Sequence, residues 1–218
     1  MESGRLIVLE GAEGAGKSTQ LRRLAEYLAS AGQTVIGVRE PGGTVLGDAI
    51  RRILLDPSTD VVPRSEALLF MASRAQLVER EIRPAIAAGA TVLVDRFFLS
   101  TYAYQGAGRG LPPHQLRDAN GMATNGLLPD LTLLLTLPVA EGLARAARRG
   151  ERDRMERSEL AFHERVAAAF AEFATPAWQA AHPECGPIVP IDACGPESEV
   201  FARILTALRD RWPGTSLS

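Results

Sequence analysis

The chain has 218 residues, 46% of them hydrophobic, and a net charge of −2. This balance lacks the basic excess typical of proteins that bind nucleic acid, and no run of about 18 apolar residues predicts a membrane span. We therefore expect a single domain over residues 1–218 that binds neither nucleic acid nor membrane. Because the first predicted strand begins within a few residues of Met1, we expect no signal peptide and a cytoplasmic location.

Predicted strands and helices alternate along the chain. Short β-branched, apolar runs predict strands, in chain order, at residues 5–10, 34–38, 91–95, 131–136 and 187–191. Apolar residues at three- and four-residue spacing predict helices at residues 17–31, 44–55, 64–88, 99–106, 113–124, 139–148, 158–181 and 197–211. This alternation predicts an α/β fold, in which a parallel sheet is covered on both faces and binds ligands at the carboxyl ends of its strands.

The first strand leads into a glycine-rich phosphate-binding loop (P-loop), with the pattern G-x-x-x-x-G-K-S. Its glycines let backbone N–H groups turn toward a polyphosphate, and the following helix adds partial positive charge. Lys17, the sole lysine of the chain, can reach the β- and γ-phosphates, while the Ser18 hydroxyl can ligate Mg²⁺. The alternative is a plain strand-to-helix turn capped by serine. We expect an ATP site with Mg²⁺, formed by Gly11, Ala12, Glu13, Gly14, Ala15, Gly16, Lys17, Ser18 and Thr19.

Other residues narrow the choice among P-loop proteins. A GTPase would carry an Asn-Lys-x-Asp motif, which the single lysine excludes. Arg39 directly follows the second predicted strand. Asp95 ends the third predicted strand, and Arg96 follows it. The carboxylate suits the outer coordination sphere of Mg²⁺ and the arginines suit phosphate oxygens, although each could be a surface charge. A small phosphotransferase or a small ATP-driven switch remains.

Six motifs together resemble the bacterial thymidylate kinase family. They are Glu-Gly-Ala-Glu-Gly-Ala-Gly-Lys-Ser-Thr (10–19), Arg-Glu-Pro-Gly-Gly-Thr (39–44), Glu-Ala-Leu-Leu-Phe-Met-Ala-Ser-Arg-Ala-Gln (66–76), Asp-Arg-Phe (95–97), Ser-Thr-Tyr-Ala-Tyr-Gln-Gly (100–106) and Pro-Asp-Leu-Thr-Leu (129–133). The resemblance runs from about residue 5 to about residue 193. It implies transfer of the γ-phosphoryl group of ATP to dTMP by a homodimer. It also implies a three-layer P-loop NTPase fold with a five-stranded parallel sheet and a short mobile lid.

The resemblance further implies an acceptor site for dTMP. Phe70 would stack on the thymine ring, and Arg74, on the same helix face, would donate to a ring carbonyl. The implied substrate-binding residues are Glu13, Arg51, Phe70, Arg74, Arg96, Ser100, Thr101, Tyr104 and Gln105. Within this set, Glu13 would accept from the 3′-hydroxyl and Tyr104 would crowd the 2′ position. Phe70 and Tyr104 could instead be core aromatics, and Glu13 a solvated side chain.

The arginine-rich run at residues 145–154 resembles the family's lid, expected at about 145–157. Gly14 stands where one branch of the family has an arginine, and in the other branch the lid supplies that arginine. Arg148 and Arg149 would then contact ATP, and Arg149 or a near neighbour would stabilise charge on the transferring group. A solvated charged face is the alternative. The expected catalytic residues are Lys17, Arg39, Asp95, Arg96 and Arg149, and the expected metal-binding residues are Ser18 and Asp95.

Some questions stay open at this point. The competing functions are a deoxynucleoside or other nucleoside monophosphate kinase and an ATP-binding switch. The pair Phe70 and Arg74 favours the function that the thymidylate kinase resemblance implies over both. Thr136 departs from the family, which often has Asp there. The apolar faces around 45–85 and 97–106 could form a dimer interface or could be core.

Overall fold

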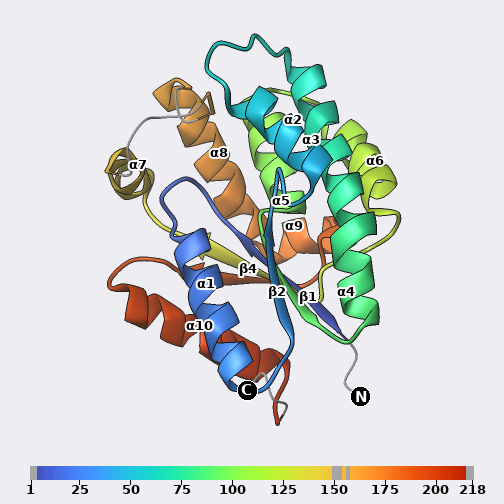
Figure 1. Cartoon of the computed structure of the whole chain (residues 1–218). Helices are drawn as coiled ribbons and strands as arrows, with labels where there is room; N and C mark the ends of the chain where they lie inside the picture. The colour runs from blue at the N-terminus through green and yellow to red at the C-terminus, as the bar shows by residue number, and fades with distance from the viewer. Residues whose placement is uncertain (1–3, 149–153, 156–157, 215–218) are drawn as a thin grey trace.

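The sheet of this protein contains five parallel strands (Figure 1). In the computed structural model, which describes residues 4–148, 154–155 and 158–214, they are β1 (Arg5–Glu10), β2 (Val35–Arg39), β3 (Thr91–Asp95), β4 (Leu131–Thr136) and β5 (Ile188–Asp192). Their order across the sheet is β2-β3-β1-β4-β5, and every neighbouring pair is parallel. The predicted α/β sheet is confirmed, with β2 and β5 each shifted by one residue.

Helices cover both faces of the sheet (Figure 1). The longer ones are α1 (Lys17–Ser30), α2 (Val45–Leu55), α3 (Pro63–Leu77), α6 (Pro113–Thr124), α7 (Val139–Ala147), α8 (Leu160–Phe173) and α10 (Glu197–Arg211). The shorter ones are α4 (Arg83–Ala87), α5 (Phe98–Thr101), α9 (Pro176–Ala181), the π-helical η1 (Val78–Ile82) and η2 (Tyr102–Gly108), and the 3₁₀ turn η3 (Pro183–Cys185). Among these, α1 and α10 pack on one face, and α3, α5, η2 and α8 pack on the other.

The two faces have separate apolar cores. Ile7 and Leu9 of β1 pack with α1 and α10, whereas Leu6 and Val8 pack with the helices of the opposite face. All four side chains are fully buried. A central parallel strand buried on both faces needs an unbroken apolar run, which explains the sequence of β1.

Two predicted long helices are interrupted. The helix expected at 64–88 is divided into α3, η1 and α4, and Pro84 supplies a reason: it lacks an N–H and its ring crowds the carbonyl four residues earlier. The helix expected at 158–181 ends at Phe173 and restarts as α9, where the Thr175 side chain caps the Trp178 N–H. The segment expected at 99–106 begins as α5 and continues as η2.

In the part of the chain that the structure describes, no helix is both long and apolar enough to cross a bilayer.

Candidate active site

The carboxyl ends of β1, β2 and β3 meet at one edge of the sheet. Arg39 of β2 is in register with Asp95 of β3, and Asp95 is in register with Leu9 of β1. The P-loop leaves β1 directly after Glu10. The loop and both charged strand ends therefore lie together, as parallel pairing requires.

The P-loop adopts a backbone that only glycine accepts without strain. The φ angle is +73° at Gly14 and +86° at Gly16, and Gly16 immediately precedes α1. Helix α1 thus starts at Lys17, so its free N–H groups lie at the loop, where a phosphate would be stabilised.

The Lys17 ammonium is buried within this loop. Its Nζ donates to the carbonyl oxygens of Gly11, at 2.9 Å, and Ala12, at 3.0 Å. The pKa of Lys17 is lowered from 10.5 to about 8, chiefly by burial and then by the Arg96 cation, against the opposite effect of nearby carboxylates. A bound polyphosphate would supply the negative charge that this ammonium lacks.

Ser18 and Asp95 form an oxygen-rich pair beside the loop. The exposed Ser18 hydroxyl donates to Asp95 Oδ2 at 2.6 Å. Mg²⁺ prefers oxygen ligands and is held by one or two protein oxygens together with waters and substrate phosphates. Within the described residues, no group of three His, Cys, Asp or Glu side chains could hold a metal ion. The Ser18–Asp95 pair fits the sparse protein ligation of Mg²⁺ bound with a nucleotide.

Glu13 points into the site, where it meets Arg96 and Tyr104. Arg96 Nη2 donates to Glu13 Oε1 at 2.7 Å, and the Tyr104 hydroxyl donates to the same oxygen at 2.9 Å. The Arg96 guanidinium also lies over the Tyr104 ring, 4.8 Å from its centroid. Burial raises the pKa of Tyr104, so this hydroxyl stays a donor. With these two bonds, Glu13 is not the solvated side chain of the alternative interpretation.

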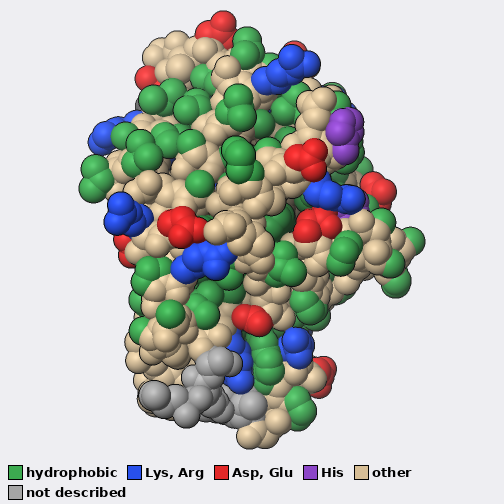
Figure 2. Space-filling view, turned by 90° about the vertical axis from the view of Figure 1, so that its right-hand side faces the viewer, with side chains coloured by type: hydrophobic (Ala, Val, Ile, Leu, Met, Phe, Trp, Pro, Cys, Tyr) green, Lys and Arg blue, Asp and Glu red, His purple; other side chains and the backbone are tan. Residues whose placement is uncertain are grey.

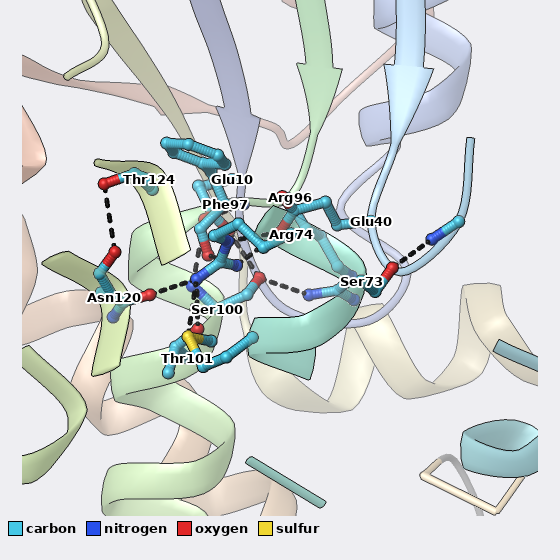
Figure 3. Close-up of polar contacts among 12 residues, drawn as sticks. Glu10, Glu40, Ser73, Arg74, Arg96, Phe97, Ser100, Thr101, Asn120 and Thr124 are labelled. Carbon is cyan, nitrogen blue, oxygen red and sulfur yellow. Dashed lines mark hydrogen bonds and ion pairs between the residues drawn. The ribbon is translucent and has the colours of Figure 1, made fainter. Parts of the chain in front are cut away.

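Glu10, the last residue of β1, holds the turn that carries Arg96. Its fully buried carboxylate accepts from the backbone N–H groups of Phe97, at 2.7 Å, and Ser100, at 3.0 Å. The Ser100 hydroxyl donates to the second carboxylate oxygen at 2.6 Å (Figure 3). Arg96 has a φ of +73°, which is rare outside glycine, and these bonds stabilise that backbone. Sequence reasoning missed Glu10.

Arg74 lies at the centre of a buried polar network (Figure 3). Its Nε and Nη2 donate to Glu40 Oε2, at 2.7 and 2.5 Å. The remaining N–H groups donate to Thr101 Oγ1, to Asn120 Oδ1 and to the Phe97 carbonyl. Burial raises the pKa of Glu40, and Arg74 opposes that shift. All five N–H donors of Arg74 thus have acceptors inside the protein.

These groups surround a cavity of about 210 Å³. The predicted residues that line it are Glu13, Gly14, Gly16, Lys17, Ser18, Arg39, Arg51, Phe70, Arg74, Asp95, Arg96, Ser100, Thr101, Tyr104 and Gln105. Phe70 is half-buried there, whereas Tyr104 is buried and also packs on aromatic rings of α8. Gly11, Ala12, Ala15 and Thr19 do not line the cavity.

Four further residues, Glu40, Pro41, Leu55 and Met155, line the cavity without having been predicted. Glu40 and Pro41 belong to the motif at 39–44, so that motif carried a signal for them. Leu55 ends an ordinary apolar helix run and Met155 lies among charged residues, and nothing in their sequence context marks either as a pocket residue.

Known proteins share this sequence and fold. A family model described as thymidylate kinase matches residues 9–181. The chain belongs to the thymidylate kinase family. The thymidylate kinase of Deinococcus radiodurans is 49% identical over 211 residues, which cover 97% of this chain and 99% of that protein. That of Nitratidesulfovibrio vulgaris is 46% identical, over 93% of this chain and 95% of that protein.

The fold agrees with this membership. A crystal structure of the thymidylate kinase from Ehrlichia chaffeensis superposes with a TM-score of 0.73 and 28% identity, covering 95% of this chain and 99% of that one. As a thymidylate kinase, the chain is a phosphotransferase of the family that phosphorylates dTMP to dTDP with ATP as donor.

The predicted thymidylate kinase lid is only partly described. Arg148 is exposed at the end of α7, and Arg149 lies outside the described residues. Arg145 pairs with Glu141 and donates to the Ala193 carbonyl. Arg154 pairs with Glu66 of α3. The run is thus not a uniformly solvated face.

Two other expectations can be compared with the thymidylate kinase structure. Thr136, at the end of β4, donates through its hydroxyl to the Ile191 carbonyl of β5 at 3.3 Å. Of the two apolar faces considered for a dimer, residues 97–106 are buried within the chain and are core. Of the two alternatives for this segment, the structure supports the core, with α8 packed on η2.

Proposed function

We propose that the chain binds ATP with Mg²⁺ at the P-loop, binds dTMP in the adjoining part of the cavity, and transfers the γ-phosphoryl group directly between them. The observation that carries this proposal is one continuous cavity, which is lined by Lys17 and Ser18 on one side and by Phe70 and Thr101 on the other. Two phosphate-bearing substrates placed in one cavity can react without a covalent enzyme intermediate.

On the donor side, Lys17 and the start of α1 would bind the β- and γ-phosphates. Ser18 and Asp95 would hold Mg²⁺, which neutralises charge on the phosphate oxygens when it is bound. Arg148 or Arg149 would add a cation at the transferring group, since Gly14 leaves the loop without an arginine.

On the acceptor side, the half-buried Phe70 ring would stack on thymine. Arg74 would reach a ring carbonyl by sharing one of its N–H groups, and Glu13 would accept from the 3′-hydroxyl. Arg39, Arg51 and Arg96 line the same cavity and would offset the repulsion between the two substrates. No general base is needed, because the acceptor phosphate is already anionic.

Coupled measurement of ADP release tests this proposal. The acceptors are dTMP, dUMP, dCMP, dGMP, AMP and thymidine, and we expect dTMP to give the highest kcat/KM. Activity on thymidine without activity on dTMP, or ATP turnover that no acceptor changes, would overturn it. Preference for another monophosphate would leave a kinase with a different base pocket.

We also propose that the chain forms a homodimer through α2, α3 and α6. These helices pack side by side and expose Val45 (93%), Ile53 (46%), Leu68 (62%) and Met122 (78%). Figure 2 shows hydrophobic side chains distributed over this side of the molecule, between charged ones. Light scattering should give twice the chain mass, and Leu68→Glu should give the monomer mass. A monomeric wild-type protein would contradict the proposal.

The single domain and the cytoplasmic location stay predictions.

A further inference from the structure

Glu66, in the first turns of α3, is a fully buried carboxylate that has no part in the chemistry described so far. Its Oε1 accepts from Gln105 Nε2 at 2.9 Å and lies 3.4 Å from Arg109 Nε. Its Oε2 accepts from Arg154 Nη2 at 2.7 Å. One carboxylate thereby joins α3, η2 and the segment 154–155. A buried charge is costly unless it is paired, so this arrangement is strongly determined.

Arg154 extends the connection to the end of α2. Its Nε donates to the Leu54 carbonyl at 2.7 Å, and its backbone N–H donates to the Leu55 carbonyl at 3.1 Å. The Arg154 side chain is only 13% exposed. Arg154 belongs to the arginine-rich run expected to close over ATP. Its guanidinium nevertheless donates hydrogen bonds to α2 and α3.

The residues held by this network line the acceptor part of the cavity. Gln105, Leu55 and Met155 all line it, and Phe70 follows Glu66 by one helical turn on α3. Met155 is 6% exposed, with its sulfur 3.6 Å from Arg154 Nη2. Gln105 is bonded to Glu66, Met155 contacts Arg154, and the Leu55 carbonyl accepts from the Arg154 backbone N–H.

We propose that Glu66 is a positioning residue for the acceptor pocket, acting directly on Gln105 and through Arg154 on Met155. This inference rests on the proposed dTMP site. It assigns Arg154 to the acceptor rather than to ATP, which separates it from Arg148 and Arg149 of the same run. The pocket residues that the network contacts belong to α2, η2 and position 155 and not to the P-loop, so its loss should weaken dTMP binding and leave ATP binding almost unchanged.

Steady-state kinetics of Glu66→Gln, Arg154→Gln and Met155→Ala test the inference, with dTMP and ATP varied separately. We expect KM for dTMP to rise about tenfold in each, because a displaced wall loses several substrate contacts, while KM for ATP stays within about twofold. Arg165→Gln is the matched control. Arg165 donates to the carbonyls of Ala107 and Gly108 at the far end of η2 and does not line the cavity, so both KM values should stay near wild type.

A merely structural role has a different signature. It would lower the unfolding midpoint and the active fraction while both KM values stayed at wild type. That result would overturn the inference. Equal rises in both KM values would also overturn it. The double variant Glu66→Gln/Arg154→Gln should raise KM for dTMP no more than the worse single variant, because both act through one ion pair. If Glu66→Gln does not fold, Met155→Ala decides, since it leaves the ion pair intact. Failure of the wild-type enzyme on dTMP would count against the proposed function, whereas wild-type activity with unchanged variant KM values would count against this inference alone.

Discussion

Gly14 of the P-loop and Gly142 of α7 meet backbone to backbone. A Cβ on Gly14 would overlap the Gly142 carbonyl, and a Cβ on Gly142 would lie 2.5 Å from the Glu13 carbonyl oxygen. The loop is therefore seated directly on the helix that leads into residues 145–157. Neither position has room for a side chain. This packing therefore excludes an arginine at position 14 of the P-loop.

Gly14→Ala should lower kcat/KM for ATP by at least about tenfold, because the added methyl group displaces the loop and a φ of +73° disfavours alanine. Gly121→Ala is the control, since its Cβ would meet nothing within 4 Å on α6. Kinetics with ATP varied at saturating dTMP provide the measurement. Equal activity of the two variants would show that the contact does not matter.

Lys17 should make stability depend on pH. Its folded pKa of about 8 lies below the ordinary 10.5, so the unfolded chain holds this proton more tightly than the folded one. The cost of burying the ammonium is fully present below about pH 8 and disappears as pH rises toward about 10.5. Wild type should therefore gain stability relative to Lys17→Met between these values. Urea unfolding of both proteins at pH 7, 9 and 10 measures this difference in unfolding free energy. A difference that is the same at all three pH values would contradict the prediction.

Asp95→Asn should raise the Mg²⁺ concentration for half-maximal activity by about tenfold, because a carboxylate next to the metal ligand orients that ligand and attracts the cation. Titration of activity with MgCl₂ at fixed ATP measures this. Asp118→Asn, on the exposed face of α6, removes the same charge elsewhere and should leave the titration unchanged. An unchanged Asp95→Asn titration would remove Asp95 from the metal site.

Glu40→Gln should destabilise the fold by about 3–5 kcal/mol, since it leaves the buried Arg74 guanidinium without its anion. Glu26→Gln breaks the Arg22–Glu26 pair, in which both side chains are 64% exposed, and should cost about 0.5 kcal/mol or less. Urea unfolding at pH 7 compares the two. Similar losses would mean that the Arg74 network contributes little.

Arg149→Ala should reduce kcat by about 10³-fold with little change in either KM, the effect expected of a cation that stabilises a transferring phosphoryl group. The exposed Arg209→Ala on α10 is the control for loss of a positive charge. Single-turnover measurements would separate the chemical step from product release. If both variants keep activity within a few fold of wild type, Arg149 does not stabilise the transferring phosphoryl group, and another arginine has that role.

Much of this site could be predicted because its signals are local in the chain. The P-loop pattern occupies eight successive residues, and Arg39 and Asp95 end strands whose parallel pairing brings them together. Even so, two long helices were predicted as continuous, because a helical period does not show how the chain adapts before Pro84 or around Thr175.

By itself, the sequence determined the α/β alternation, the phosphate loop and the charges at the strand ends, since each follows from neighbouring residues and periodicity. Only the tertiary structure decided what the buried carboxylates do. Glu10 meets Phe97 across 87 residues, Glu40 meets Arg74 across 34, and Glu66 meets Arg154 across 88. In the sequence such a glutamate is indistinguishable from a surface charge. Its partner is selected only when folding removes it from water and makes an unpaired charge too costly to keep.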